Sequence, residues 1–125
     1  SDDPVLQQEL GYALQATGDS KAAIDVYRSV VTLAPGAEIA RGLLANLLYE
    51  QGRPDDAIAL VQEGLQRDPQ APFLRPRLGS LLEQSGRPRE AAREYREYAR
   101  LVPNAPDAKE LTDRADRLEA ASGGS

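Results

Sequence analysis

One spacing constrains this chain more than any other feature of its sequence: five columns of identical residues recur every 34 positions without a gap. The columns are Gly18, Gly52 and Gly86; Ala23, Ala57 and Ala91; Pro35, Pro69 and Pro103; Leu10, Leu44 and Leu78; and Leu14, Leu48 and Leu82. Self-similarity at a fixed period of about 20 to 50 residues indicates a repeat architecture. The chain therefore divides into three repeats, 4–37, 38–71 and 72–105, followed by a remnant at 106–121.

Each repeat has the pattern of two helices joined by a glycine turn. In repeat one, Leu10 and Leu14 precede Gly18 at helical spacing, and Ala23 and Tyr27 follow it. Glycine suits the position just after a helix, because it adopts positive φ without a Cβ clash. Proline stops the second helix of each repeat. The pattern predicts helices near 4–17, 20–33, 38–51, 54–67, 72–85, 88–101 and 106–121.

Caps and small residues support this division. Pro54 and Pro88 stand at the start of second helices, where proline is tolerated, and Ser20 is the expected N-cap of another. Since one hairpin cannot bury its apolar face alone, we expect the repeats to stack into a single domain, 1–121, closed by a polar-faced capping helix. Two columns of small residues should allow close helix approach: Ala23, Ala57 and Ala91, and Gly11, Ala45 and Gly79.

Composition excludes several function classes. The 125 residues include no Cys, His, Met or Trp, and the net charge is −5. Thiolate chemistry is therefore excluded, as are histidine bases and histidine ligands. We expect no enzyme activity, metal or cofactor, and a soluble protein of the bacterial cytoplasm or periplasm. Residues 122–125 read Ser-Gly-Gly-Ser, an expected flexible linker or scar, and the missing initial Met favours an excised or engineered fragment.

A row of arginines raises the question of whether the chain binds nucleic acid. The row comprises Arg89, Arg93, Arg96 and Arg100, on one face of the helix at 88–101. Because acidic residues run beside it, we expect ion pairs such as Glu90–Arg93 and Arg93–Glu97 on a solvated face. Phosphate binding is the less favoured alternative, since the chain is acidic overall.

The repeated residues resemble the tetratricopeptide repeat (TPR) family. The family pattern stands in repeat one as Leu10-Gly11, Leu14, Gly18, Ala23, Tyr27 and Pro35, and in repeat three as Leu78-Gly79, Leu82, Gly86, Ala91, Tyr95 and Pro103. Repeat two reads Leu44-Ala45, Leu48, Gly52, Ala57, Val61 and Pro69. The early Trp of the family is replaced by Gln7, Arg41 and Arg75. The resemblance implies an all-α, right-handed α-solenoid of three helix-turn-helix TPR units with a seventh, capping helix.

The resemblance also implies a function, a non-catalytic scaffold that binds a peptide or helix of a partner in a concave groove lined by the first helices. It places these candidate binding residues in the groove: Val5, Gln8, Tyr12, Ile39, Gly42, Asn46, Tyr49, Phe73, Arg77 and Ser80. Other groove positions are Gln15, Ala16, Glu50, Pro76, Glu83 and Gln84. Exposed aromatic and amide side chains suit partner contact. Gly42 and Pro76 are expected to leave room for a bound chain. The alternative is that Tyr12 and Tyr49 pack between helices.

The groove residues also narrow the choice of partner. Carboxylate-clamp members of the family hold acidic chaperone tails with polar and basic residues at the positions of Gln8, Tyr12, Leu43, Phe73 and Arg77. Only Arg77 fits that pattern, so we expect an apolar or aromatic-bearing protein segment in place of a chaperone C-terminal acidic tail. Nucleic acid and membrane are not expected partners. The alternatives are a structural or oligomerisation module whose repeats stack head to tail in self-association, and an accessory domain excised from a larger protein.

Overall fold

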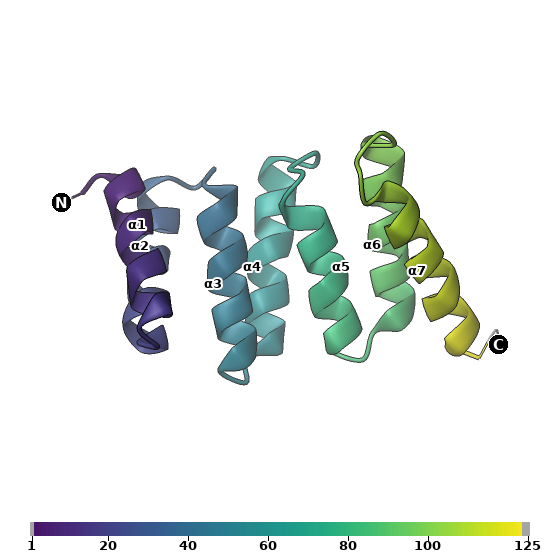
Figure 1. The fold of residues 1–125 in the computed structure, drawn as a ribbon, viewed down its shortest axis with the longest axis horizontal. Coiled ribbons are helices and arrows are strands. Elements are labelled where there is room, and N and C mark those ends of the chain that lie inside the picture. Colours follow the sequence, from purple (N-terminus) through teal and green to yellow (C-terminus); the bar gives the residue numbers. More distant parts are fainter. Residues whose placement is uncertain (1, 124–125) are drawn as a thin grey trace.

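The chain forms an elongated array of helices. The computed structural model describes residues 2–123, and within them it contains seven α-helices and no strand. The helices are α1 (Pro4–Ala16), α2 (Ser20–Leu33), α3 (Glu38–Glu50), α4 (Pro54–Arg67), α5 (Leu74–Gln84), α6 (Pro88–Leu101) and α7 (Ala108–Ala121). They follow one another in chain order, so the two termini lie at opposite ends (Figure 1). The predicted all-α repeat fold is confirmed.

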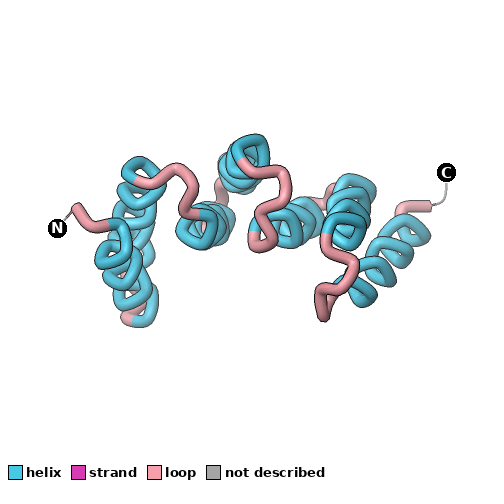
Figure 2. Tube along the Cα trace, turned by 90° about the horizontal axis from the view of Figure 1, so that it is seen from above, coloured by secondary structure: helices cyan, strands magenta, loops and turns pink. Residues whose placement is uncertain are grey.

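The helices form two layers. The odd-numbered helices lie in one layer and the even-numbered helices in the other (Figures 1 and 2). Each helix packs against the next, and α3 also contacts α5 across a repeat boundary. Figure 2 shows the odd-numbered layer curving, with α1 and α7 projecting beyond α3 and α5. The first helices of the repeats therefore line the hollow side of the array.

The glycine column ends the first helix of each repeat as predicted. Gly18, Gly52 and Gly86 have φ of 85°, 78° and 77°. This left-handed conformation favours glycine, because any Cβ would strain the backbone. The 34-residue spacing thus reflects one turn geometry used three times.

Two helices begin later than predicted. Helix α5 begins at Leu74, two residues after the predicted start, and the Phe73 N–H before it donates to the Glu38 carboxylate at 3.2 Å. Helix α7 begins at Ala108, where Asp107 accepts a hydrogen bond from the Tyr98 hydroxyl at 2.8 Å. In both cases a side chain from elsewhere in the array holds the turn open.

The N-cap predicted for α2 is wrong by one residue. Asp19 is the cap, and its carboxylate accepts from the Ala22 N–H at 3.2 Å, whereas Ser20 is the first helical residue. Asp3 caps α1 in the same way, accepting from the Val5 N–H at 2.9 Å. Both carboxylates lie at the positive end of a helix dipole.

A leucine column shows where the array is open. Leu44 and Leu78 are 2% and 3% exposed, whereas Leu10 at the equivalent position is 51% exposed. The same residue type at equivalent positions therefore does not have the same burial in repeat one. Leu44 and Leu78 belong to hairpins that pack against a preceding one, whereas within residues 2–123 the hairpin of Leu10 is the first.

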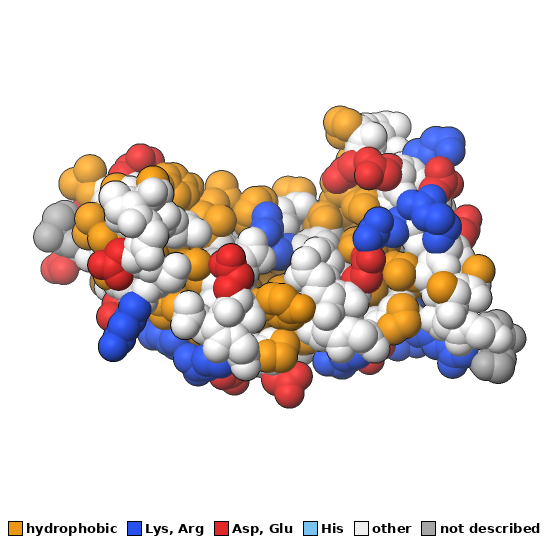
Figure 3. Space-filling view, turned by 60° about the horizontal axis from the view of Figure 1, so that its bottom comes forward, with side chains coloured by type: hydrophobic (Ala, Val, Ile, Leu, Met, Phe, Trp, Pro, Cys, Tyr) orange, Lys and Arg blue, Asp and Glu red, His pale blue; other side chains and the backbone are white. Residues whose placement is uncertain are grey.

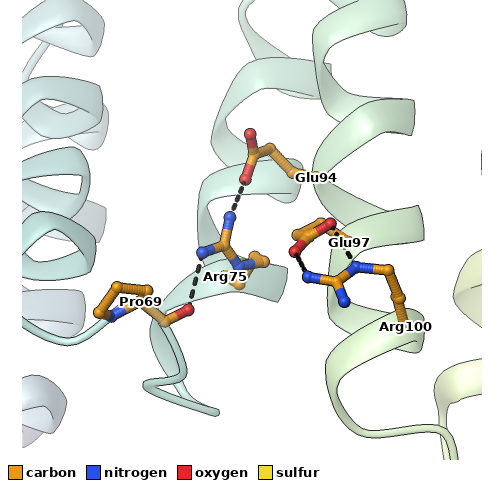
Figure 4. Close-up of polar contacts among 5 residues, drawn as sticks. All are labelled: Pro69, Arg75, Glu94, Glu97 and Arg100. Carbon is orange, nitrogen blue, oxygen red and sulfur yellow. Dashed lines mark hydrogen bonds and ion pairs between the residues drawn. The ribbon is translucent and has the colours of Figure 1, made fainter.

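In repeats two and three an arginine stands where the family has its early Trp, and it forms hydrogen bonds in place of aromatic packing. Arg41 and Arg75 donate to the carbonyls of Pro35 and Pro69, at 2.9 and 2.7 Å. Figure 4 shows Arg75 directed at Pro69 on one side and at Glu94 of α6 on the other, where the ion pair spans 2.8 Å. Since both residues of each proline–arginine pair recur at the 34-residue spacing, this is a repeated device that anchors the turn between repeats.

The arginine row on α6 is paired differently from the prediction. Arg96 pairs with Asp116 at 2.6 Å and with Glu119, both on α7. Arg100 pairs with Glu97 one turn before it, as Figure 4 also shows. The predicted pairs of Arg93 with Glu90 and Glu97 are not among those formed, because Glu90 pairs with Arg87. Within the row, Arg96 thus connects α6 to α7, whereas Arg100 pairs within α6.

The C-terminal end continues this pattern. The Ser122 hydroxyl donates to the Leu118 carbonyl at 2.7 Å, and its own carbonyl accepts from Arg89 at 3.2 Å. Ser122 is thus an ordered cap of α7, while residues 124–125 of the expected linker lie outside the described residues. No described helix combines the length and the apolar character needed to cross a membrane.

Candidate functional site

A pocket of about 410 Å³ opens on the odd-numbered layer between α3 and α5. The residues that line it are Asn46, Tyr49, Glu50, Arg77, Ser80, Leu81 and Gln84. Four predicted binding residues meet here: Asn46, Tyr49, Arg77 and Ser80. Because most of the lining is polar, the pocket offers both hydrogen-bond donors and acceptors to a ligand.

Arg77 is the most distinctive group in this pocket. Its guanidinium carbon lies 4.3 Å from the centre of the Phe73 ring, a cation–π geometry. Its Nε is buried without a hydrogen-bond partner, and Arg77 forms no ion pair within residues 2–123. Burial lowers the pKa of the Arg77 guanidinium below its usual value. A positive charge that forms no ion pair in the described chain is thus held at the wall of a pocket that Glu50 also lines.

Gly42 does not leave room for a ligand, and that prediction is wrong. A Cβ on Gly42 would lie 2.4 Å from the Phe73 ring and 3.0 Å from Cδ of Arg77. The space above Gly42 is therefore filled by the chain itself. Because Gly42 has no side chain, the Phe73 ring can pack against α3, where it contacts the Arg77 guanidinium.

Tyr49 combines packing with pocket lining. Its ring packs against the buried core, and its hydroxyl donates to the Gln84 carbonyl at 3.0 Å. This bond ties the end of α3 to the end of α5, so the two walls of the pocket are held at a fixed separation. Tyr49 therefore packs between helices, as the alternative interpretation of the sequence had it, and also lines the pocket.

The predicted residues of α1 lie outside this pocket. Tyr12 packs edge-on against Tyr27, with ring centres 6.4 Å apart, and its hydroxyl accepts from the Gln8 amide at 2.9 Å. Val5 and Ile39 are exposed apolar side chains on the first turns of α1 and α3. None of these four residues lines the pocket between α3 and α5.

Glu83 and Gln15 were expected to line the groove, but both accept hydrogen bonds from other helices of the array. The Tyr95 hydroxyl donates to Glu83 at 3.0 Å, and the Tyr27 hydroxyl donates to Gln15. Arg114 of α7 also binds Glu83, at 2.7 Å from its Nε. The hydrogen bonds from Arg114, aided by that from Tyr95, hold the pKa of Glu83 below its ordinary range.

Sequence reasoning missed the role of Leu81 as a lining residue. Leu81 lies in α5 one residue after Ser80, a position that the periodicity assigns to the core. Its side chain is buried and still reaches the pocket. No sequence signal separates a buried leucine beneath a pocket from any other buried leucine.

The surface as a whole carries mixed charge. Figure 3 shows acidic and basic side chains interspersed on one face, without a broad patch of one sign. Within residues 2–123, no three acidic side chains gather closely enough to hold a metal ion. The pocket between α3 and α5 is therefore the best-defined candidate site for a ligand.

Comparison with solved structures agrees with this fold. The type III secretion chaperone SycD of Yersinia enterocolitica, in complex with a peptide of the translocator YopD, is similar with a TM-score of 0.78 and 23% identity, over 97% of this chain and 92% of that one. The first TPR domain of Spaghetti (RPAP3), bound to the HSP90 peptide SRMEEVD, has a TM-score of 0.79 and 17% identity, over 94% and 95%. The Sgt2 TPR domain of Aspergillus fumigatus has a TM-score of 0.79 and 21% identity, over 98% and 83%.

Family models settle the classification. No curated protein sequence matches the chain. A family model described as tetratricopeptide repeat matches residues 14–81, and a second of the same description matches residues 77–112. The first match alone spans more than half of the chain. The 34-residue period, the paired helices and both family matches agree, and the chain belongs to the tetratricopeptide repeat family.

Proposed function

We propose that this chain is a non-catalytic binding module that holds a peptide segment of a partner protein in the pocket between α3 and α5. The observation that carries the proposal is the Arg77 guanidinium, which is stacked on Phe73 and lacks an acidic partner in the described chain. Partial burial of a cation without an ion-pair partner carries a cost, and a ligand acceptor would offset that cost.

The remaining lining fits a peptide. The Asn46 amide and the Ser80 hydroxyl can pair with the N–H and C=O groups of an extended chain, since each offers both donors and acceptors. Val5 and Ile39 are exposed on first turns of the odd-numbered layer, where they would contact apolar side chains of a longer segment. The ligand is thus a segment with an acidic group at Arg77 and apolar residues beside it.

This proposal replaces the earlier exclusion of acidic tails. SycD was solved with a peptide of YopD, and the Spaghetti domain with an HSP90 peptide that ends in Glu-Glu-Val-Asp. Both of these similar domains were therefore solved with a bound peptide. Because the HSP90 peptide is acidic, the exclusion that rested on clamp positions is withdrawn, and Arg77 remains the group that would meet a carboxylate.

A peptide selection tests the proposal. We would select binders from a displayed peptide library, synthesise the enriched peptides, and measure their affinity by fluorescence anisotropy. The matched variants are Arg77→Gln in the pocket and Arg93→Gln, an exposed arginine on α6. We expect Asp or Glu to be enriched. We also expect Arg77→Gln to weaken binding about tenfold or more, equivalent to about 1.4 kcal/mol, while Arg93→Gln leaves the affinity unchanged.

The binding site is then located independently by NMR. Backbone amide shifts around Asn46, Tyr49 and Ser80 should move when an enriched peptide is added. Equal effects of the two arginine variants, or shifts confined to α2, α4 and α6, would place binding on the other layer and overturn the proposal.

A further inference from the structure

The N-terminal end of the array carries an apolar surface that no described residue covers. A pocket of about 420 Å³ opens there, lined by Leu6, Gln7, Leu10, Asp25, Val26 and Ser29 of α1 and α2. Leu6 is 57% exposed, and Leu10 is 51% exposed. In Figure 3 hydrophobic side chains gather toward this end, while the opposite end carries more charge. We refer to these six residues as the N-terminal face.

The other repeats show what covers such a face. The equivalents of Leu6 at the 34-residue spacing are Ala40 and Leu74, which are 0% and 1% exposed. Leu74 packs on α4, the second helix of the preceding repeat. Its Cδ1 lies so close to Gly64 of α4 that a Cβ on this glycine would be 2.6 Å away. Inside the array, therefore, this surface is buried by a preceding hairpin. At the N-terminal face the same kind of surface meets solvent.

The opposite end of the array is not suited to pack against the N-terminal face of another copy. Helix α7 presents exposed charged residues there: Lys109, Glu110, Arg114, Asp116, Arg117 and Glu119. Several are already engaged, as Arg114 binds Glu83 and Asp116 binds Arg96. Packing Leu6 and Leu10 of one copy on α7 of another would remove these charges from water without new partners, which is costly. Head-to-tail stacking of copies is thus disfavoured.

The rim of the N-terminal face suits a copy of itself. Lys21, Asp25 and Arg28 lie on one stripe of α2, with spacings of four and three residues. All three are exposed and form no ion pair in the described chain. If two such helices cross in antiparallel fashion about a two-fold axis near Val26, Asp25 of each copy faces Arg28 of the other. The apolar centre and the charged rim are then both self-complementary.

We propose that two copies of this chain associate through their N-terminal faces into a two-fold symmetric dimer. Leu6, Leu10 and Val26 of each copy form the apolar centre. An interface of this kind uses the same patch on both subunits, and the charged α7 ends point outward. Association therefore stops at two copies. The pocket between α3 and α5 lies elsewhere, so this dimer stands independently of the proposed peptide binding.

Mass measurement over a concentration series tests the dimer. Sedimentation equilibrium of the full chain from micromolar to millimolar concentration should rise from 13.5 kDa to twice that mass and then level off. Leu10→Glu should remain at the monomer mass throughout. The matched control is Ala59→Glu, which adds the same charge at an exposed position of α4 and should dimerise like the parent. Circular dichroism checks that all three chains are folded.

Single cysteines give a test that does not depend on Leu10. The chain has no cysteine, so a disulfide can form only between introduced residues. Val26→Cys, next to the two-fold axis of the proposed dimer, should cross-link readily under mild oxidation, whereas Glu110→Cys on α7 should not. A constant monomer mass, a dimer that survives Leu10→Glu, growth beyond two copies, or preferential cross-linking at residue 110 would each overturn the proposal.

Discussion

A Cβ atom added to Gly79 would lie 2.4 Å from Cε1 of Tyr95, closer than real Cβ contacts come. The first repeat contains the same arrangement, because a Cβ on Gly11 would lie 2.4 Å from Cε1 of Tyr27. In both repeats the tyrosine ring of the second helix lies close against the glycine of the first. The glycine is therefore required by its partner ring and not by its own backbone conformation.

Repeat two has both positions exchanged, with Ala45 in place of the glycine and Val61 in place of the tyrosine, and both are fully buried. We predict that Gly79→Ala lowers the free energy of unfolding by about 1–3 kcal/mol through overpacking. Adding Tyr95→Val should cost less than the sum of the two single changes, because the pair then matches repeat two. Urea denaturation of the four chains measures this coupling, and strictly additive losses would show that the two positions are independent.

Arg41 is 1% exposed and donates to the Leu60 and Pro35 carbonyls at 3.2 and 2.9 Å. Burial lowers the pKa of its guanidinium. We predict that Arg41→Met destabilises the chain by roughly 2–4 kcal/mol, since two carbonyls lose their donor. The control is Glu63→Gln. The Glu63 side chain is 65% exposed and 3.7 Å from Arg41, so this change should cost less than about 1 kcal/mol. Equal losses in thermal or urea unfolding would show that the ion pair matters more than the carbonyls.

Leu10 and Leu44 occupy the same position in successive repeats but differ in burial, 51% against 2% exposed. We predict that Leu44→Ala costs about 2–5 kcal/mol of folding stability, as a large-to-small change in a packed core does. Leu10→Ala should cost less than about 1 kcal/mol when measured at a concentration where the chain is monomeric. If both changes lower the free energy of unfolding equally in denaturant titrations, Leu10 is buried in the monomer, contrary to this prediction.

Alkaline pH should weaken the array through its buried tyrosines. Burial raises the pKa of Tyr27 and of Tyr95 to about 12, from an ordinary value of 10.0. The folded state therefore keeps these protons longer than the unfolded state does. The stability that they contribute is fully present below pH 10 and is lost as the pH rises toward 12. Unfolding free energies measured across this range should fall, and Tyr95→Phe should fall less steeply than the parent chain. A flat profile would contradict this assignment.

The helices were predictable because their signals are local. Residues 4, 20, 38, 54 and 88 begin helices as the sequence indicates, and the glycines at 18, 52 and 86 follow the ends of α1, α3 and α5. Proline geometry and the freedom of glycine act within a few residues, so the sequence carries this information directly. The late starts at Leu74 and Ala108 depend on Glu38 and Tyr98, which come from other repeats or helices.

The candidate site was only partly predictable. The helical period places Asn46, Tyr49, Arg77 and Ser80 on a face away from the core, and these residues do meet in one pocket. The period cannot indicate that Phe73 fills the space beside Gly42, or that Glu83 is taken by Arg114. Such contacts join residues about 30 apart in sequence, and they depend on side-chain direction and on how neighbouring hairpins stack.

Local sequence signals are enough to predict the repeat length, the helix order and the small residues at helix contacts, because hydrogen bonding within turns and helices follows from residues close in the chain. Only the tertiary structure decided which equivalent positions are buried. Leu10 and Leu44 have the same neighbours in the pattern, yet one is covered by a preceding hairpin and the other is not. The same holds for Arg77, whose lack of an acidic partner depends on where every other charge lies once the helices have packed.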